Sequence, residues 1–83
     1  MDDKRKELIA VGASAAVNCR PCMEYHLNLA REAGVSAEET DDALEIGLMV
    51  NRGAASGTKK YVEDLKSGVA EKESMNVSGS GCC

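Results

Sequence analysis

Two cysteines and the only histidine of the chain form the pattern C-x-x-C-x-x-x-H, at Cys19, Cys22 and His26. Offsets of three and seven residues place the three side chains on one stripe of an α-helix. Two thiols one helical turn apart can close into a disulfide, and a histidine one turn further along can accept or hold a thiol proton. The spacing therefore predicts a redox site.

Thiolate formation decides the reactivity of such a pair, because a free cysteine with a pKa of ~8.5 is mostly protonated at neutral pH. Asn18 is a good N-cap residue, and it predicts a helix with Cys19 to Pro21 in its first turn and Cys22 directly after them. The partial positive charge at a helix N-terminus stabilises thiolates. His26 would take the proton of Cys22 or pair with its anion as imidazolium.

An acidic partner for the imidazole is expected on the preceding helix. Glu7 lies about 10 residues before the turn and His26 about 7 residues after it, so their heights in an antiparallel hairpin differ by about 4 to 5 Å. Glu7 is also the only acid within the apolar part of that helix. We therefore predict a Glu7–His26–Cys22 proton relay, with a solvated Glu7 as the alternative.

Helical spacing of apolar residues predicts the elements that position these side chains. A first helix should begin after Asp2 or Asp3 and run to about residue 17, and a second should end at Gly34 as its C′ residue. Ser36 and Glu39 form a capping box for a third helix.

Gly53 and Gly57 predict a break or kink in that third pattern, so a fourth helix is expected over about residues 54 to 66. No alternating β-strand pattern occurs, which excludes the sheet of thioredoxin-type folds, where C-x-x-C at a helix start is common. We expect an all-α protomer of about four helices over residues 1–67. A flexible polar tail should follow over residues 68–83, ending in Cys82 and Cys83.

The apolar residues are too small to build a thick core. The chain has 83 residues, no Phe or Trp, two Tyr, and an apolar fraction of 43% that is rich in alanine. A domain of this size buries only roughly 60% of its unfolded surface. We therefore predict a homo-oligomer in which third-helix side chains, Ile46 and Val50 above all, are covered by another protomer.

Charge and hydropathy argue against two classes of protein, those that bind nucleic acid and those that span a membrane. A net charge of −4 argues against nucleic acid as a partner, because phosphate binding needs clustered Lys and Arg. No apolar run reaches the ~18 residues that a membrane span requires. A C-x-x-C pair with a terminal Cys-Cys suits redox chemistry better than a secreted disulfide framework, so a cytoplasmic protein is expected.

The spacing E-x(11)-C-x-x-C-x-x-x-H, met by Glu7, Cys19, Cys22 and His26, resembles the alkylhydroperoxidase AhpD-like, or carboxymuconolactone decarboxylase, family. The likeness extends over roughly residues 7 to 66 through the Gly34 turn, the acidic start of the third helix and the segment 52–55. The resemblance implies an all-helical, oligomeric protein of the redox branch of this family. It further implies that Cys22 is the attacking thiol, that Cys19 is the resolving thiol, and that His26 and Glu7 form the proton relay.

Two features of the family refine this expectation. The decarboxylase branch generally lacks the cysteine pair, so the resemblance implies a redox member. Some peroxidase members have a second histidine between the cysteines, where this chain has Pro21. Dithiol–disulfide exchange is therefore the main expectation, with weak peroxide reduction as a secondary one. The substrate would be a disulfide or a peroxide, an external thiol would be the reductant, and no cofactor is implied.

The same residues are also consistent with other roles. Cys19 and Cys22 could be small buried residues at a helix start, and His26 could be a satisfied core or interface histidine. The chain would then be a non-enzymatic helical oligomerisation module. Two thiolates and an imidazole could also bind zinc, with Cys82 or Cys83 as the fourth ligand.

Overall fold

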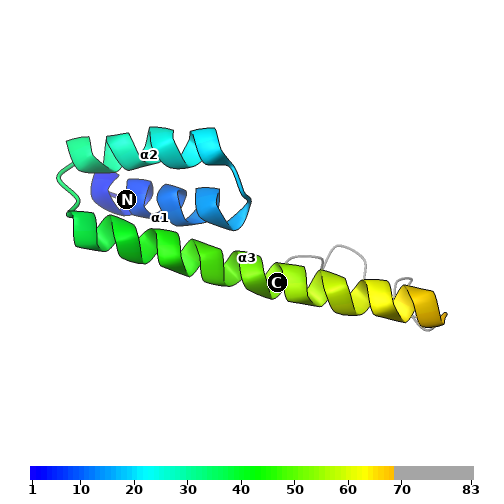
Figure 1. Ribbon diagram of the computed structural model, residues 1–83. Coiled ribbons are helices and arrows are strands. Elements are labelled where there is room, and N and C mark those ends of the chain that lie inside the picture. The colour runs from blue at the N-terminus through cyan, green and yellow to red at the C-terminus, as the bar shows by residue number, and fades with distance from the viewer. Residues whose placement is uncertain (69–83) are drawn as a thin grey trace. The chain divides into compact units, whose positions relative to one another are not determined.

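The computed structural model describes residues 1–68 and contains three helices: α1 (Asp3–Ala16), α2 (Arg20–Glu32) and α3 (Ala37–Ser67) (Figure 1). No strand occurs within this described part, so the predicted all-α class is confirmed. The chain divides into two compact units, Met1–Asn51 and Arg52–Cys83. Most of the predicted tail, residues 69–83 with its two terminal cysteines, lies outside the described residues.

The start of α1 follows the predicted cap. Asp2 is the N-cap, and its carboxylate accepts a hydrogen bond from the backbone N–H of Arg5 at 2.8 Å. This bond satisfies one of the N–H groups that a helix leaves free at its start.

The end of α1 departs from the prediction at Asn18. The residue was expected as the N-cap of the next helix, but it has a left-handed backbone with φ of 59°. The N–H of Asn18 donates to the carbonyl of Ala15 at 3.3 Å, and the N–H of Cys19 donates to Ser14 at 3.0 Å. These bonds form a Schellman motif with Asn18 at C′, a position that asparagine tolerates better than most residues.

A second Schellman motif ends α2 at the predicted glycine. Gly34 has φ of 92°, its N–H donates to Arg31 at 3.0 Å, and the N–H of Val35 donates to Ala30 at 3.0 Å. Ala30 and Val35 are both buried, which supplies the apolar contact that usually accompanies this motif.

The predicted capping box opens α3. The N–H of Glu39 donates to the Ser36 hydroxyl at 3.2 Å, and the N–H of Ser36 donates to the Glu39 carboxylate at 3.2 Å. The two residues therefore satisfy each other's free donors.

The helix then continues for 31 residues, so the predicted break at Gly53 and Gly57 and the separate fourth helix are wrong. A glycine costs about 1 kcal/mol in a helix relative to alanine. Good helix formers such as Ala54, Ala55 and Lys59 surround the two glycines. Extending an existing helix adds a hydrogen bond for every residue fixed, and here that cooperativity outweighs the cost of two glycines.

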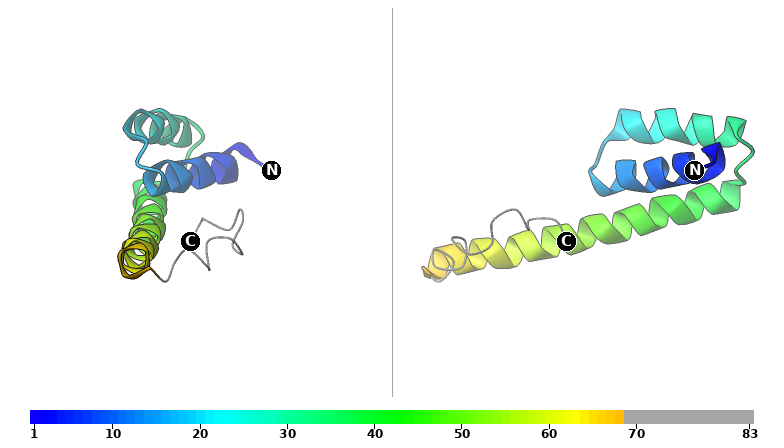
Figure 2. Two further views of the ribbon diagram at one scale, coloured as in Figure 1. Left: turned by 90° about the vertical axis from the view of Figure 1, so that its right-hand side faces the viewer. Right: turned by 180° about the vertical axis from the view of Figure 1, so that it is seen from behind.

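Within Met1–Asn51, α1 lies beside both other helices. Figures 1 and 2 show α1 and α2 running in opposite directions, and the first part of α3 on another side of α1. The contact with α3 is a close backbone approach. A Cβ added at Gly12 would lie 3.2 Å from the carbonyl oxygen of Ala43, and one added at Gly47 would overlap the carbonyl oxygen of Gly12.

The core of this unit is small, as the composition predicted. Val11 and Ala30 are fully buried, Val35 is nearly so, and Leu8, Ala43 and Leu44 pack around them. The Asn51 side-chain amide donates to the carbonyl of Ala16 at 2.9 Å, which ties the end of α1 to α3.

The described part of the second unit is the helical segment Arg52–Ser67 with Gly68. Lys60 and Asp64 form an i,i+4 ion pair at 3.2 Å, and the Ser67 hydroxyl donates to the carbonyl of Asp64. Three large apolar side chains of this segment are exposed, Tyr61, Val62 and Leu65. None of the helices in residues 1–68 is both long and apolar enough to span a membrane.

Candidate redox site

The two cysteines of the C-x-x-C pair form a disulfide at the start of α2. Cys19 and Cys22 are bonded to each other, with their Cα atoms 5.2 Å apart. The backbone N–H of Cys22 donates to the sulfur of Cys19 at 3.3 Å. Cys19 is the N-cap of α2, so its sulfur accepts a hydrogen bond from one of the helix's free N–H groups.

Cys19 therefore has two local roles. Its N–H closes the Schellman motif at the end of α1, and its side chain caps the start of α2. Both roles fix its backbone at the tight turn between the helices. Pro21 lies in the first turn of α2, where a missing N–H leaves no intrahelical bond unmade. Pro21 fits the first turn of a helix that begins after Cys19 as well as one that begins after Asn18, so it does not distinguish the two caps.

Glu7 and His26 meet across the α1–α2 hairpin. His26 Nδ1 lies 2.7 Å from Glu7 Oε1, although the residues are 19 positions apart in sequence. The Glu7 side chain is 8% exposed and that of His26 is 30% exposed. The carboxylate is thus almost removed from water while the imidazole retains an accessible edge.

This contact orients the imidazole. An ionised carboxylate can only accept, so with Glu7 ionised it is Nδ1–H of His26 that donates the hydrogen bond. In the neutral ring, Nε2 is then the nitrogen with a free lone pair. His26 lies four residues after Cys22 in the same helix, and this offset places the two side chains on one face. The arrangement allows Nε2 to act as a base on that face while Glu7 stabilises the resulting imidazolium.

Three further residues support the site, and the sequence did not identify them. The Tyr25 ring packs edge-on against His26, with ring centroids 5.0 Å apart and an interplanar angle of 77°. Ser14 is buried, and its carbonyl accepts the N–H of Cys19. Asn51 ties the C-terminal end of α1 to α3. No sequence pattern marks a residue that packs on a histidine or one whose backbone carbonyl accepts a hydrogen bond at a helix end. Only the geometry of the folded helices identifies these residues.

The structure joins the predicted site residues in two pairs. Cys19 and Cys22 are bonded at the start of α2, and His26, one turn further along α2, contacts Glu7 of α1. Within residues 1–68, no three His, Cys, Asp or Glu side chains are grouped so that they could hold a metal ion. The fourth zinc ligand suggested by the sequence, Cys82 or Cys83, lies outside this range. With its sulfurs bonded to each other, the pair can exchange the disulfide with a thiol or another disulfide.

Comparison with known proteins gives one family match. The family described as the carboxymuconolactone decarboxylase family matches residues 1–58, which include the cysteine pair, His26 and Glu7. No curated protein and no solved structure matches the chain significantly.

Proposed function

Because this chain belongs to the carboxymuconolactone decarboxylase family and carries a Cys19–Cys22 pair beside a Glu7–His26 contact, we propose that it is a dithiol–disulfide oxidoreductase. The family includes enzymes, and the redox activity is our assignment for this member. The observation that carries it is the combination of a disulfide at a helix N-terminus with a carboxylate-oriented histidine one turn away. A purely structural disulfide would need no such histidine.

In the reducing direction, the Cys22 thiolate attacks one sulfur of a substrate disulfide. A bond forms between Cys22 and that sulfur, the substrate S–S bond breaks, and the first substrate thiolate leaves. The Cys19 thiolate then attacks the Cys22 sulfur and releases the second substrate thiolate. The substrate gains two electrons and two protons, and the enzyme becomes the Cys19–Cys22 disulfide.

His26 and Glu7 manage the protons of this cycle. Nε2 of His26 removes the Cys22 proton and can return it to a departing thiolate, while Glu7 holds the ring in orientation through Nδ1. The backbone N–H of Cys22 favours negative charge on the Cys19 sulfur. That preference makes Cys19 the better leaving group when a reductant attacks the disulfide at Cys22.

An external thiol reductant completes the cycle. Its thiolate attacks Cys22, Cys19 leaves as a thiolate, and a second thiol resolves the mixed disulfide. The cytoplasm, where thiols are kept reduced, is the compartment that we propose for it. With a peroxide as substrate, the Cys22 thiolate attacks the terminal oxygen, the O–O bond breaks, an alcohol leaves and Cys22 becomes a sulfenic acid. Cys19 then attacks the Cys22 sulfur, which forms the disulfide and releases water. We propose this as the weaker activity.

Reduction of insulin or dithionitrobenzoate by the pre-reduced protein tests the assignment. All variants should carry Cys82→Ser and Cys83→Ser, so that thiol counts report only on the pair. Cys22→Ser should abolish turnover, and Cys19→Ser should accumulate a mixed disulfide with substrate, visible by intact mass. Cys82→Ser/Cys83→Ser alone is the matched control and should keep its activity.

The result that would refute the proposal is full turnover in Cys22→Ser, or no turnover in the control with either substrate. In the latter case the helical oligomerisation module becomes the better description. Counting free thiols before and after mild oxidation then shows whether the pair cycles at all.

A further inference from the structure

The Glu7 carboxylate holds the imidazole of His26 at one atom only. Nδ1 lies 2.7 Å from Glu7 Oε1, whereas Nε2, the nitrogen assigned to the proton of Cys22, is on the far side of the ring. A ring held at one atom can still tilt about that contact and carry Nε2 away from its target. A general base must stay within about 3.2 Å of the atom whose proton it removes, so the proton transfer requires a second restraint on the ring.

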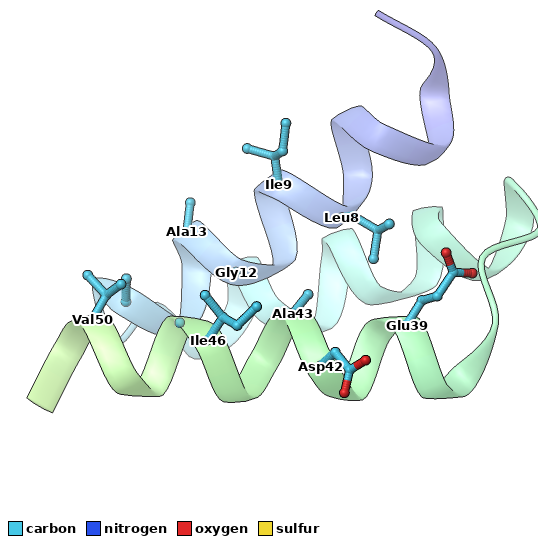
Figure 3. A pocket seen from close by; sticks show the side chains of 11 residues that line it. Leu8, Ile9, Gly12, Ala13, Glu39, Asp42, Ala43, Ile46 and Val50 are labelled. Carbon is cyan, nitrogen blue, oxygen red and sulfur yellow. The ribbon is translucent and has the colours of Figure 1, made fainter.

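The groove of the first unit does not provide that restraint. This groove of about 590 Å³ is lined by residues of α1 and α3, among them Ile9 and Ile46 (Figure 3). No residue of α2 lines it, so it encloses neither the cysteine pair nor the imidazole. The side chain of His26 is 30% exposed, and burial alone does not hold it. A further restraint has to come from a side chain beside it on α2.

Tyr25 makes a second contact with the imidazole. The ring centroids of Tyr25 and His26 lie 5.0 Å apart at an interplanar angle of 77°, the edge-to-face arrangement that aromatic rings prefer. Side chains of an α-helix lean toward its N-terminus, so the side chains three and four residues after Cys22 both lie over the turn that begins there. Tyr25 and His26 therefore share the side of α2 on which Cys22 lies.

The packing of the protein does not account for an aromatic ring at this position. Tyr25 is 62% exposed and does not belong to the buried cluster of Val11, Ala30 and Val35. A side chain that keeps most of its surface in water contributes little to the stability of the core. The contact of its ring with His26 is the interaction that distinguishes it from an ordinary surface residue.

We propose that Tyr25 is a positioning residue for the redox reaction. Its ring and the Glu7 carboxylate hold the imidazole of His26 through two separate contacts, so that Nε2 stays directed at Cys22. This inference rests on the proposed function, which assigns the proton of Cys22 to Nε2. Tyr25 itself exchanges neither a proton nor electrons with the substrate, and its effect passes entirely through His26.

Alkylation of Cys22 by iodoacetamide tests the proposal in the full chain. All proteins carry Cys19→Ser, Cys82→Ser and Cys83→Ser and are reduced, which leaves Cys22 as the one thiol. Tyr25→Ala should slow alkylation about 3-fold at pH 7 and move the rate profile to higher pH, because the base is less well placed. It should keep its circular-dichroism helicity, since alanine is the better helix former at an exposed position.

Two further variants separate the ring from other effects of the substitution. Tyr25→Phe keeps the ring and removes the titratable hydroxyl, so its rate should stay within about 1.5-fold of the parent. Asn28→Ala shortens another exposed polar side chain of α2 and should leave the profile in place. Slowing in Tyr25→Phe equal to that in Tyr25→Ala would show that the hydroxyl is required, and it would overturn the proposal.

A double-mutant cycle tests whether the effect passes through His26. In a His26→Ala background, Tyr25→Ala should slow alkylation by no more than about 1.3-fold, because the group that it positions is already absent. The same 3-fold slowing in both backgrounds would mean that Tyr25 acts directly on Cys22, and the proposal would be wrong.

Single-turnover reduction of dithionitrobenzoate, with Cys19 and Cys22 both intact, separates positioning from substrate binding. Tyr25→Ala should lower the rate at saturating substrate about 3-fold and leave the half-saturating concentration unchanged. A change confined to the half-saturating concentration would make the ring a substrate contact and refute its positioning role. Absence of turnover in the wild type would refute the oxidoreductase assignment, whereas the alkylation cycle would still decide whether Tyr25 positions His26.

Discussion

Gly47 and Gly57 belong to the same helix but to different units of the chain, and their surroundings are opposite. A Cβ at Gly47 would overlap the carbonyl oxygen of Gly12 and approach the Cβ of Ala15 to 2.7 Å, whereas a Cβ at Gly57 would meet nothing within 4 Å. In Met1–Asn51, glycine is required by the packing of two backbones. In the segment Arg52–Ser67, nothing within the described chain requires it, although it lowers helix stability.

The buried side chains of residues 1–68 all lie in Met1–Asn51. Val11 is fully buried there and the Glu7 side chain is 8% exposed, although Ile9 and Ile46 remain exposed. In the segment Arg52–Ser67, Tyr61 and Leu65 remain exposed. The first unit therefore contains the packed core and the cysteine–histidine site, and the described part of the second is a helical segment with exposed apolar side chains.

The largest effect should come from adding one methyl group at each glycine. Gly47→Ala should lower the free energy of unfolding by about 2–3 kcal/mol, because the α1–α3 backbones must separate. Gly57→Ala should raise it by about 0.5–1 kcal/mol through helix propensity. Urea unfolding at one fixed protein concentration measures both. Equal destabilisation by the two substitutions would remove the contrast between the units.

A smaller effect is expected on thiol reactivity, and only from the first unit. In a reduced Cys19→Ser, Cys82→Ser, Cys83→Ser background, His26→Ala should slow iodoacetamide alkylation of Cys22 about 10-fold at pH 7. The alkylation profile should move to higher pH, because the thiolate loses its base and its imidazolium partner. Glu7→Gln should also slow the alkylation of Cys22, by about 3-fold, because the imidazole of His26 loses the carboxylate that orients it.

Tyr61→Ala, in the second unit, is the control for this experiment and should leave the profile in place. A His26→Ala profile identical to that of the parent would mean that the helix N-terminus alone activates the sulfur.

The smallest effect concerns two residues with left-handed backbones. Asn18, with φ of 59°, closes the turn that carries Cys19, and Gly68, with φ of 81°, follows the end of α3. Asn18→Ala should cost about 1 kcal/mol of unfolding free energy, and Asn18→Gly should cost almost nothing. Gly68→Ala should fray the end of α3, raising amide hydrogen exchange there without moving the urea midpoint. A midpoint shift in Gly68→Ala as large as that in Asn18→Ala would contradict the comparison.

Local chemistry explains which parts of the fold could be predicted. The Asp2 cap, the Ser36–Glu39 capping box and the Gly34 terminus depend on residues at most a few positions apart, and the sequence predicts each of them. The two wrong predictions are also local in origin. Asn18 is favoured both at an N-cap and in the left-handed region, and glycines that favour a break are outweighed by the cooperativity of a long helix.

The geometry of the candidate site likewise follows from the sequence only in part. The sequence alone determined that Cys22 and His26 share one helix face, because covalent spacing and the 3.6-residue period fix that relation. Cys19, which was expected on the same face, is instead the N-cap of α2 with an extended backbone. The sequence also showed that an antiparallel hairpin would bring Glu7 to about the level of His26.

Only the tertiary structure decided that Nδ1 of His26 faces the Glu7 carboxylate, that Tyr25 packs on the ring, and that α1 and α3 meet at Gly12 and Gly47. Rotation of one helix about its axis leaves residue spacing unchanged but determines which side chains touch. Only packing against the neighbouring helices sets that rotation.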